Sequence, residues 1–299
     1  MPAADGTVSW RELLAETTDR LERGGIEAAA SEGRWIVEEA SGLEATDLIL
    51  GLDEPATVRM VAHLDAMVDR RLAGEPIQYV LGHWSFRHLD LLVDRRVLIP
   101  RPETEQVVEV ALAAHDRVRT ARGDRHRATV VDLGTGTGAI ALAIATERTG
   151  SRVWGVERSP DALAVARANL AGLGMAGSGV QLVEGSWFDP LPDDLRGTVD
   201  LVISNPPYIG EHEPLDASVA DWEPVAALVP GPSGLEAYET IVAAVGEWLA
   251  PGGAVVLEIG STQAGAVRSL LEAHGLVDVA VHRDLAGLDR TVAATRPPH

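Results

Sequence analysis

The chain has 299 residues and a formal net charge of −20, from 25 basic and 45 acidic side chains. Every basic residue is arginine and there is no cysteine, which excludes a lysine base, a thiol nucleophile and a cysteine-ligated metal site. The acidic balance also argues against tight binding to nucleic acid, because that affinity comes largely from neutralised phosphates.

The first part of the chain is predicted to be a small helical bundle, which we expect to form a domain over residues 1–75. Ser9 and Glu12 have the S-x-x-E pattern of a capping box before the first helix. Apolar residues at helical spacing predict further helices over about residues 26–40, 46–52 and 57–73. The first residues contain no basic side chain and no apolar run reaches the length of a membrane span, so we expect neither a signal peptide nor a transmembrane helix.

Residues 76–98 are expected to form a linker that contains a β-hairpin, because the spacing of apolar residues changes there to that of two short strands. A helix is predicted over residues 103–114. The run at 117–127 holds five arginines and is interpreted as a solvated connector. The third expected domain covers residues 99–299.

From residue 128 the chain alternates between strands and helices. This alternation predicts an α/β domain with a mostly parallel sheet, helices on both faces, and ligands bound outside the carboxyl ends of the strands. The seven expected strands cover residues 129–133, 152–156, 180–183, 199–204, 254–259, 277–281 and 291–294, and the helices between them cover 139–148, 160–170, 235–249 and 262–274.

A glycine-rich turn joins the first of these strands to the helix that follows it. Asp132 precedes the run Gly134, Thr135, Gly136, Thr137 and Gly138, whose G-x-G-x-G spacing differs from the G-x-G-x-x-G of dinucleotide enzymes. The pattern resembles the first motif of class I S-adenosylmethionine (SAM) methyltransferases. Glu157 ends the next strand, where an acidic side chain can accept both ribose hydroxyls; that position alone does not separate a SAM enzyme from an NAD enzyme.

The word Asn205-Pro206-Pro207-Tyr208 follows the strand at 199–204. Its chemistry suits an amide or aromatic amine, whose two N–H groups can be held by the side-chain oxygen of Asn205 and the carbonyl of Pro206. The prolines stiffen the loop, and Tyr208 offers a flat face to a planar acceptor group. An acceptor without these donors would leave buried oxygens unpaired, at about 1–3 kcal/mol each. We therefore predict catalytic roles for Asn205, Pro206 and Tyr208.

With both motifs placed, the chain resembles the bacterial release-factor glutamine methyltransferases (the HemK/PrmC family). The resemblance runs from about residue 74 to residue 295. The segments that carry it cover residues 74–82, 97–105, 132–142, 185–188, 204–209, 223–228 and 284–290. Among them the Ile-Pro-Arg-Pro-Glu-Thr-Glu word at 99–105 is the most specific to the family, whereas the Asn-Pro-Pro-Tyr word is shared with many amino-methyltransferases.

The resemblance implies a Rossmann-like methyltransferase domain behind a helical domain that helps to grip the substrate. It implies transfer of a methyl group from SAM, without a metal, to the glutamine side-chain nitrogen in the Gly-Gly-Gln loop of class 1 peptide chain release factors. It further implies a monomer in the cytoplasm with no membrane and no stable nucleic-acid partner. The implied cofactor residues are Gly134 to Gly138, Glu157, Trp187 beside the adenine, and Asn205; the implied substrate residues are Asn205, Pro206, Pro207, Tyr208, Arg101 and Glu103.

Three departures and three alternatives accompany this hypothesis. The ribose position is Glu157 where the family commonly has Asp, the hairpin carries His83-Trp84 and Arg87-His88, and Glu258-Ile259-Gly260 lacks a His often found there.

A nucleic-acid amino-methyltransferase would use the same clamp, the pair of acceptors at Asn205 and Pro206, on the amino group of a flipped base. A non-enzymatic binding module leaves that clamp without a purpose, and an NAD oxidoreductase also conflicts with the glycine spacing.

Overall fold

The computed structural model describes residues 7–123 and 125–298, in two units that divide between His83 and Trp84. Each unit is considered by itself. The expectation that the chain starts without a signal peptide falls largely on residues 1–6 and so lies outside the described residues. Within the described ranges, no helix is both long and apolar enough to cross a membrane.

The first unit is the predicted bundle of helices. The capping box is present, since the Ser9 side chain accepts from the Glu12 backbone N–H at 3.3 Å and the Glu12 carboxylate accepts from the Ser9 N–H at 3.0 Å. The helices are α1 (Trp10–Arg23), α2 (Ala29–Ser41), α3 (Ala45–Gly51), α4 (Val58–Leu72) and α5 (Ile77–Leu81). Their buried apolar side chains form one core, which includes Trp10, Leu21, Ile36, Val37, Leu64, Met67 and Val68.

Two of the ion pairs in this unit involve buried carboxylates, those of Glu32 and Glu75. The Arg71 guanidinium lies 2.6 Å from the buried carboxylate of Glu32, and Arg70 binds Glu75 at 2.7 Å while also donating to the Tyr79 carbonyl. The sequence did not predict α5, because five residues are too few to display a helical period.

The second unit is the predicted α/β domain, and its fold class is confirmed. Strands β1 (His83–Phe86) and β2 (Leu89–Leu92) form the expected hairpin. The seven-stranded sheet has the order β5-β4-β3-β6-β7-β9-β8, in which the first five strands are parallel and β9 runs antiparallel to both neighbours. Its strands are β3 (Thr129–Leu133), β4 (Arg152–Glu157), β5 (Val180–Glu184), β6 (Val199–Ser204), β7 (Leu249–Glu258), β8 (Val277–Arg283) and β9 (Asp289–Thr295).

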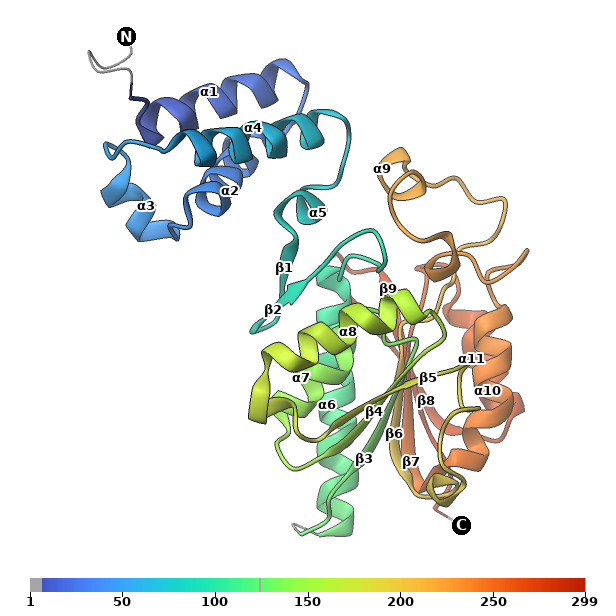
Figure 1. Cartoon of the computed structure of the whole chain (residues 1–299). Helices are drawn as coiled ribbons and strands as arrows, with labels where there is room; N and C mark the ends of the chain where they lie inside the picture. Colours follow the sequence, from blue (N-terminus) through green and yellow to red (C-terminus); the bar gives the residue numbers. More distant parts are fainter. Residues whose placement is uncertain (1–6, 124, 299) are drawn as a thin grey trace. The chain divides into compact units, whose positions relative to one another are not determined.

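Helices cover both faces of this sheet (Figure 1). Successive residues of a strand point to opposite faces, so Val130 joins the core beneath α6 and α7 while Val131 joins the core beneath α10 and α11. The helices of the unit are α6 (Pro102–Arg122), α7 (Ala139–Glu147), α8 (Pro160–Gly172), α9 (Ala217–Ala220), α10 (Glu236–Trp248) and α11 (Ala264–Ala273). Helix α6 starts, and strands β3, β4 and β6 end, at the same edge of the sheet (Figure 1).

Two predicted boundaries were wrong. Helix α6 continues to Arg122, so the first arginines of the basic run belong to a helix and not to a connector. Burial of Val118 stabilises this last part of the helix. Strand β7 starts at Leu249 and not at residue 254. Leu249 pairs with Val199, and the ladder between β6 and β7 contains a register shift between Val199 and Leu201.

The turn of the hairpin also gives a role to an unusual residue. Arg87 has a φ of 55°, in the region that favours glycine. Its guanidinium lies 2.5 Å from Glu147 at the end of α7 and 2.5 Å from Glu109 in α6, while its backbone N–H donates to Glu105. These bonds tie the hairpin to two helices of the sheet domain.

Candidate active site

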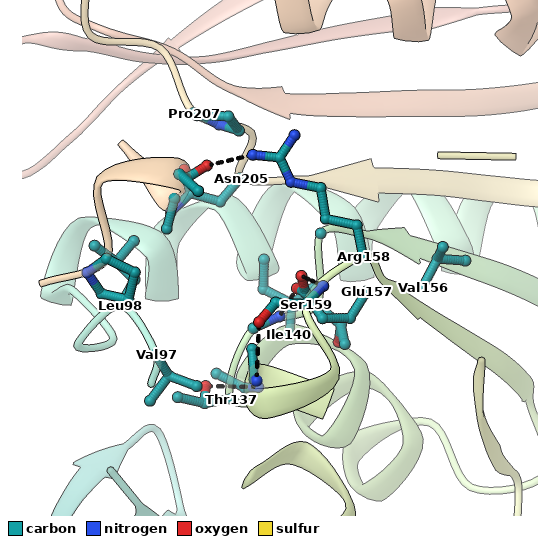
Figure 2. A pocket seen from close by; sticks show the side chains of 18 of the residues that line it. Val97, Leu98, Thr137, Ile140, Val156, Glu157, Arg158, Ser159, Asn205 and Pro207 are labelled. Atoms are coloured by element: carbon teal, nitrogen blue, oxygen red, sulfur yellow. Dashed lines mark hydrogen bonds between the residues drawn. The ribbon is translucent and has the colours of Figure 1, made fainter. Parts of the chain in front are cut away.

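Two adjoining pockets lie at the carboxyl ends of β3, β4 and β6. The first has about 1100 Å³ of empty space, its open mouth included, and the glycine turn, Glu157, Trp187 and Asn205 line it. The second is lined by Arg101, Asn205, Pro206, Tyr208 and the chain near α9. Asn205 lines both pockets, so it lies at the junction between them. Figure 2 shows the first pocket, with Glu157 and Ser159 on one side and Asn205 and Pro207 on the other.

The glycine turn exposes backbone rather than side chains to the first pocket. Gly134, Gly136 and Gly138 have φ values of 72°, 54° and 86°, which L side chains rarely adopt. The N–H groups of Gly134 and Thr135 both donate to the Val156 carbonyl at 2.9 Å, and this ties the turn to the end of β4. Gly138 is the N-cap residue that precedes α7 and does not line the pocket, whereas the four residues from 134 to 137 do.

A buried carboxylate supports the turn from below. Asp132 accepts from the Thr135 hydroxyl at 2.5 Å and from the Ala141 N–H at 3.2 Å. Burial raises the pKa of Asp132 to about 7. Its contacts are to the turn and to α7, so it shapes the loop without lining the pocket.

Glu157 is nearly buried at the end of β4, with its carboxylate held by two backbone donors. One oxygen accepts from the Gly136 N–H at 3.0 Å and the other from the Ser159 N–H at 2.9 Å, as dashed lines show in Figure 2. Each carboxylate oxygen has a further lone pair, so two hydroxyls of a ribose can still be accepted. The longer arm of Glu, compared with the Asp common in the family, is thus fixed in place before a ligand binds.

Trp187 lies in the segment after β5 and also lines the first pocket. Its φ of 47° places it in the left-handed region, and its ring packs against the core beneath α10. This combination presents one flat apolar side chain to the pocket, which suits stacking against an adenine.

Asn205 is held from behind by buried side chains of two other elements. Its Nδ2 donates to the Thr104 hydroxyl at 3.3 Å, and that hydroxyl donates to the Glu258 carboxylate at 2.7 Å. Thr104 lies in the first turn of α6 and Glu258 ends β7, and both are buried. Within residues 7–123 and 125–298, no hydrogen bond reaches the other end of the amide, the Asn205 Oδ1.

Pro206 and Tyr208 complete the second pocket. Among the described residues no donor reaches the Pro206 carbonyl, whereas the Tyr208 carbonyl accepts from the Gln263 side chain at 2.9 Å. Burial raises the pKa of the Tyr208 hydroxyl to about 12, so this side chain stays neutral at physiological pH. Pro207 points back to the first pocket instead (Figure 2).

The mouth of both pockets is formed by the segment before α6. Arg101 lines both pockets and binds the buried Glu223 at 2.5 Å, while the other oxygen of Glu223 accepts from the Ile99 N–H at 3.1 Å. Glu103, which the resemblance also implied, lines neither pocket. Among the described residues, no group of three or more His, Asp or Glu side chains could hold a metal ion.

Thr104, Glu223 and Glu258 are functional residues that the sequence did not predict. Each acts through a partner more than 100 positions away in the chain, the separations being 101 for Asn205–Thr104, 124 for Ile99–Glu223 and 154 for Thr104–Glu258. For Thr104 and Glu223 the signal available in the sequence was their position inside segments that resemble the family, whereas Glu258 lies outside those segments.

Two family models and several relatives of known function match this chain. The model of the PrmC N-terminal domain family matches residues 12–82, and a methyltransferase domain model matches residues 124–272. A release factor glutamine methyltransferase of Burkholderia pseudomallei is 43% identical, with 90% of this chain and 92% of that protein covered. Another, from Geobacter sulfurreducens, is 39% identical, with 94% and 95% covered.

Solved structures share the fold at much lower identity. A methyltransferase from Pyrococcus furiosus superposes with a TM-score of 0.50 at 18% identity, over 77% of this chain and 97% of that one. The fold and the matching domain model define the protein as a SAM-dependent methyltransferase of class I. Because the two relatives named above are similar over at least 90% of this chain, the family can also be stated: the chain belongs to the release factor glutamine methyltransferase family.

Proposed function

We propose that this protein methylates the side-chain amide nitrogen of the glutamine in the Gly-Gly-Gln motif of class 1 peptide chain release factors, with SAM as the methyl donor. The observation that carries the proposal is the position of Asn205, which lines both the pocket suited to the donor and the adjoining pocket. The family membership supplies the identity of the substrate.

The first pocket fits SAM through groups that this chain already holds in place. The turn at residues 134–137 offers backbone close to the ligand, at the start of α7, where a carboxylate is favoured. The Glu157 carboxylate would accept the ribose hydroxyls and Trp187 would lie beside the adenine. When bound, SAM supplies a methyl group that is already activated by attachment to a positively charged sulfur, so no metal is required.

The second pocket would hold the glutamine. Asn205 Oδ1 and the Pro206 carbonyl are two acceptors without a partner among the described residues, and they match the two N–H groups of a primary amide. Tyr208 provides a flat wall for the planar amide. Held in this way, the amide nitrogen faces the junction between the pockets, and such orientation removes about 7–11 kcal/mol from a barrier between well-placed reactants.

A hydroxyl or thiol substrate would be rejected at this site, because it cannot satisfy both acceptors and each unpaired buried oxygen costs about 1–3 kcal/mol. An exocyclic amino group of a base offers the same two N–H groups, so the clamp by itself does not separate glutamine from adenine. The net charge of −20 favours the protein substrate, since a nucleic acid would be repelled.

The decisive experiment is incubation of the protein with isotopically labelled SAM and a purified release factor, followed by mass spectrometry of the Gly-Gly-Gln peptide. We expect a gain of one methyl group on that glutamine and none in a release factor whose glutamine is replaced. Label in added RNA or DNA, with none in the release factor, would overturn the proposal.

We further propose that the protein acts as a monomer in the cytoplasm, without a membrane or a stable nucleic-acid partner. Light scattering coupled to size-exclusion chromatography tests this directly, and the expected mass is the 31.7 kDa of one chain. A mass of two chains would contradict the monomer.

A further inference from the structure

The site contains a chain of three side chains that the proposed function does not by itself explain. Behind Asn205, the Thr104 hydroxyl and the Glu258 carboxylate continue inward from the pocket, at 3.3 Å and 2.7 Å. The three residues come from different elements: Asn205 follows β6, Thr104 lies in α6 and Glu258 ends β7. Thr104 and Glu258 are 4% and 1% exposed. Of the three residues only Asn205 lines the second pocket, Thr104 also lines the first pocket, and Glu258 lines neither.

The direction of each hydrogen bond follows from proton counting. A carboxylate has no proton to give, so the single Thr104 proton must go to Glu258. The Thr104 oxygen is then left only with lone pairs towards Asn205, and only the NH2 end of the Asn205 amide can bond to it. The carbonyl end, Oδ1, is consequently directed away from Thr104.

This direction matters because the two ends of an asparagine amide have nearly the same size but opposite hydrogen-bonding character. With Oδ1 towards the substrate, Asn205 accepts an N–H from the glutamine amide. With the amide turned over, two NH2 groups would face each other and the acceptor would be lost.

We propose that Thr104 and Glu258 are positioning residues that select the productive orientation of the Asn205 amide, with Glu258 acting in its carboxylate form. The inference deepens the proposed function and rests on it for the identity of the substrate. The hydrogen-bond chain itself involves only residues of this protein, so it can be tested without any substrate.

The inference has a consequence for pH. Burial raises the pKa of Glu258 to about 7, and the Thr104 hydrogen bond opposes that rise. A protonated Glu258 can donate to Thr104, which frees the Thr104 proton for Asn205 Oδ1 and reverses the chain. The productive orientation is therefore present above about pH 7 and is lost as the pH falls below it.

Other charged and titratable groups around Glu258 act in both directions. Arg290 on β9 and Arg101 before α6 favour the carboxylate, and Glu103 in the first turn of α6 opposes it. Tyr208 after β6 and Tyr238 on α10 are neutral, because burial raises the pKa of each hydroxyl above its ordinary value. Arg290 is itself paired with Asp284 and donates to the Ile259 carbonyl.

The chain offers an unusually direct test, because it contains only two asparagines, Asn169 and Asn205. Protein labelled with ¹⁵N in asparagine alone should give two pairs of side-chain NH2 signals in a nuclear magnetic resonance spectrum. Asn169 is an internal control, since its Nδ2 donates to the carbonyls of Thr137 and Leu92, which do not titrate. Between pH 5.5 and 8.5 we expect the Asn205 signals to move with a midpoint near 7 and the Asn169 signals to stay.

Variants assign that midpoint to the chain of bonds. T104V keeps the volume of the side chain and removes the hydroxyl, and T104S keeps the hydroxyl as the matched control. We expect the pH step of the Asn205 signals to vanish in T104V and in E258Q, which has no titrating proton, and to persist in T104S. Circular dichroism and thermal melts establish that each variant is folded.

Kinetics on the release factor provide the second readout. In T104V we expect kcat to fall about tenfold, the value of one hydrogen bond. The dissociation constant for SAM should change less than kcat, because the substitution keeps the volume of a side chain that also lines the first pocket. In the unmodified protein kcat should rise with pH through the same midpoint, and T104S should restore most of it.

The outcomes separate the inference from the proposed function. If the Asn205 signals show no step near pH 7, or keep it in T104V, the positioning role is wrong, even if the release factor is methylated. If the step behaves as expected but the unmodified protein leaves the release factor unlabelled, the orientation chain stands and the substrate assignment fails.

Discussion

The two pockets of the active site are held in shape by different kinds of hydrogen bond. We call the first pocket, with the glycine turn and Glu157, the donor corner, and the second pocket, with Asn205 and Tyr208, the glutamine corner. In the donor corner, the Glu157 carboxylate accepts from two backbone N–H groups, those of Gly136 and Ser159. In the glutamine corner, the Asn205 side chain is held by the side chain of Thr104, and that in turn by Glu258. The first corner depends on backbone conformation and a short stretch of sequence, whereas the second depends on three side chains from separate elements.

This difference teaches where each corner is vulnerable. A side-chain change in the donor corner matters at Glu157, at Trp187 or at a glycine with positive φ, because the glycine turn presents backbone to the pocket. In the glutamine corner, by contrast, the loss of one hydroxyl changes the orientation of the group that would touch the substrate. Variants in the two corners should therefore affect different constants, SAM affinity in the first and kcat in the second.

The largest effect is expected for N205A. Removing the amide eliminates one of the two acceptors for the substrate N–H groups, and losing a preorganised group of this kind lowers kcat by about 100- to 1,000-fold. SAM affinity, measured by titration calorimetry, should weaken much less, since the turn and Glu157 remain intact. If the N205A variant keeps its turnover, Asn205 does not hold the substrate amide in the glutamine corner.

A smaller effect, and in the other constant, is expected for G134A. Gly134 has a φ of 72° and an added Cβ would meet no atom of the protein within 4 Å, so in the protein without ligand the change acts through the backbone. A left-handed conformation costs an L residue about 1–2 kcal/mol, so SAM affinity should fall about 5- to 30-fold while kcat at saturating SAM is retained.

The matched control for this glycine is G150A. Gly150 has a φ of 90° and equally open space around its Cβ position, but it lies in the turn between α7 and β4, away from both pockets. Both variants should lower the melting temperature by a similar amount, and only G134A should weaken SAM binding. Equal SAM affinities in the two variants would contradict the role of the glycine turn.

The same contrast explains how much the sequence could predict. The donor corner is local: the glycine turn follows its strand directly, Glu157 ends the next strand, and both were placed correctly at the edge of the predicted sheet. The Asn205–Tyr208 word was also placed at the end of its strand. Strand and helix periods likewise predicted the seven strands and most of the helices, because each is set by burial within a few residues.

What the sequence did not reveal depends on contacts between distant segments. In the sequence, Thr104 is only one residue of the family-specific segment at 99–105. The neighbouring residues do not show that its hydroxyl donates to Glu258, 154 positions later. The continuation of α6 to Arg122 was also missed, because the sequence did not show that Val118 is buried.

The smallest effect is expected where neither corner is involved. Arg119, in the last turns of α6, and Arg125 line a separate pocket with His115 and His126. Helix α6 ends at the edge of the sheet opposite to the one where it starts (Figure 1). Fifteen residues of helix separate Arg119 from Thr104, or about 22 Å at 1.5 Å per residue. That exceeds the Debye length of about 8–10 Å, so the charges are screened from the active site.

The double variant R119E/R125E should therefore leave kcat and KM for the release factor within about twofold. An acidic side chain near a helix C-terminus costs about 0.3–1 kcal/mol, which corresponds to a fall of a few degrees at most in melting temperature. Steady-state kinetics and a thermal melt on the same preparation check both values. A several-fold rise in KM at an unchanged melting temperature would mean that substrate recognition extends to the far edge of the sheet, so that the two corners do not account for it alone.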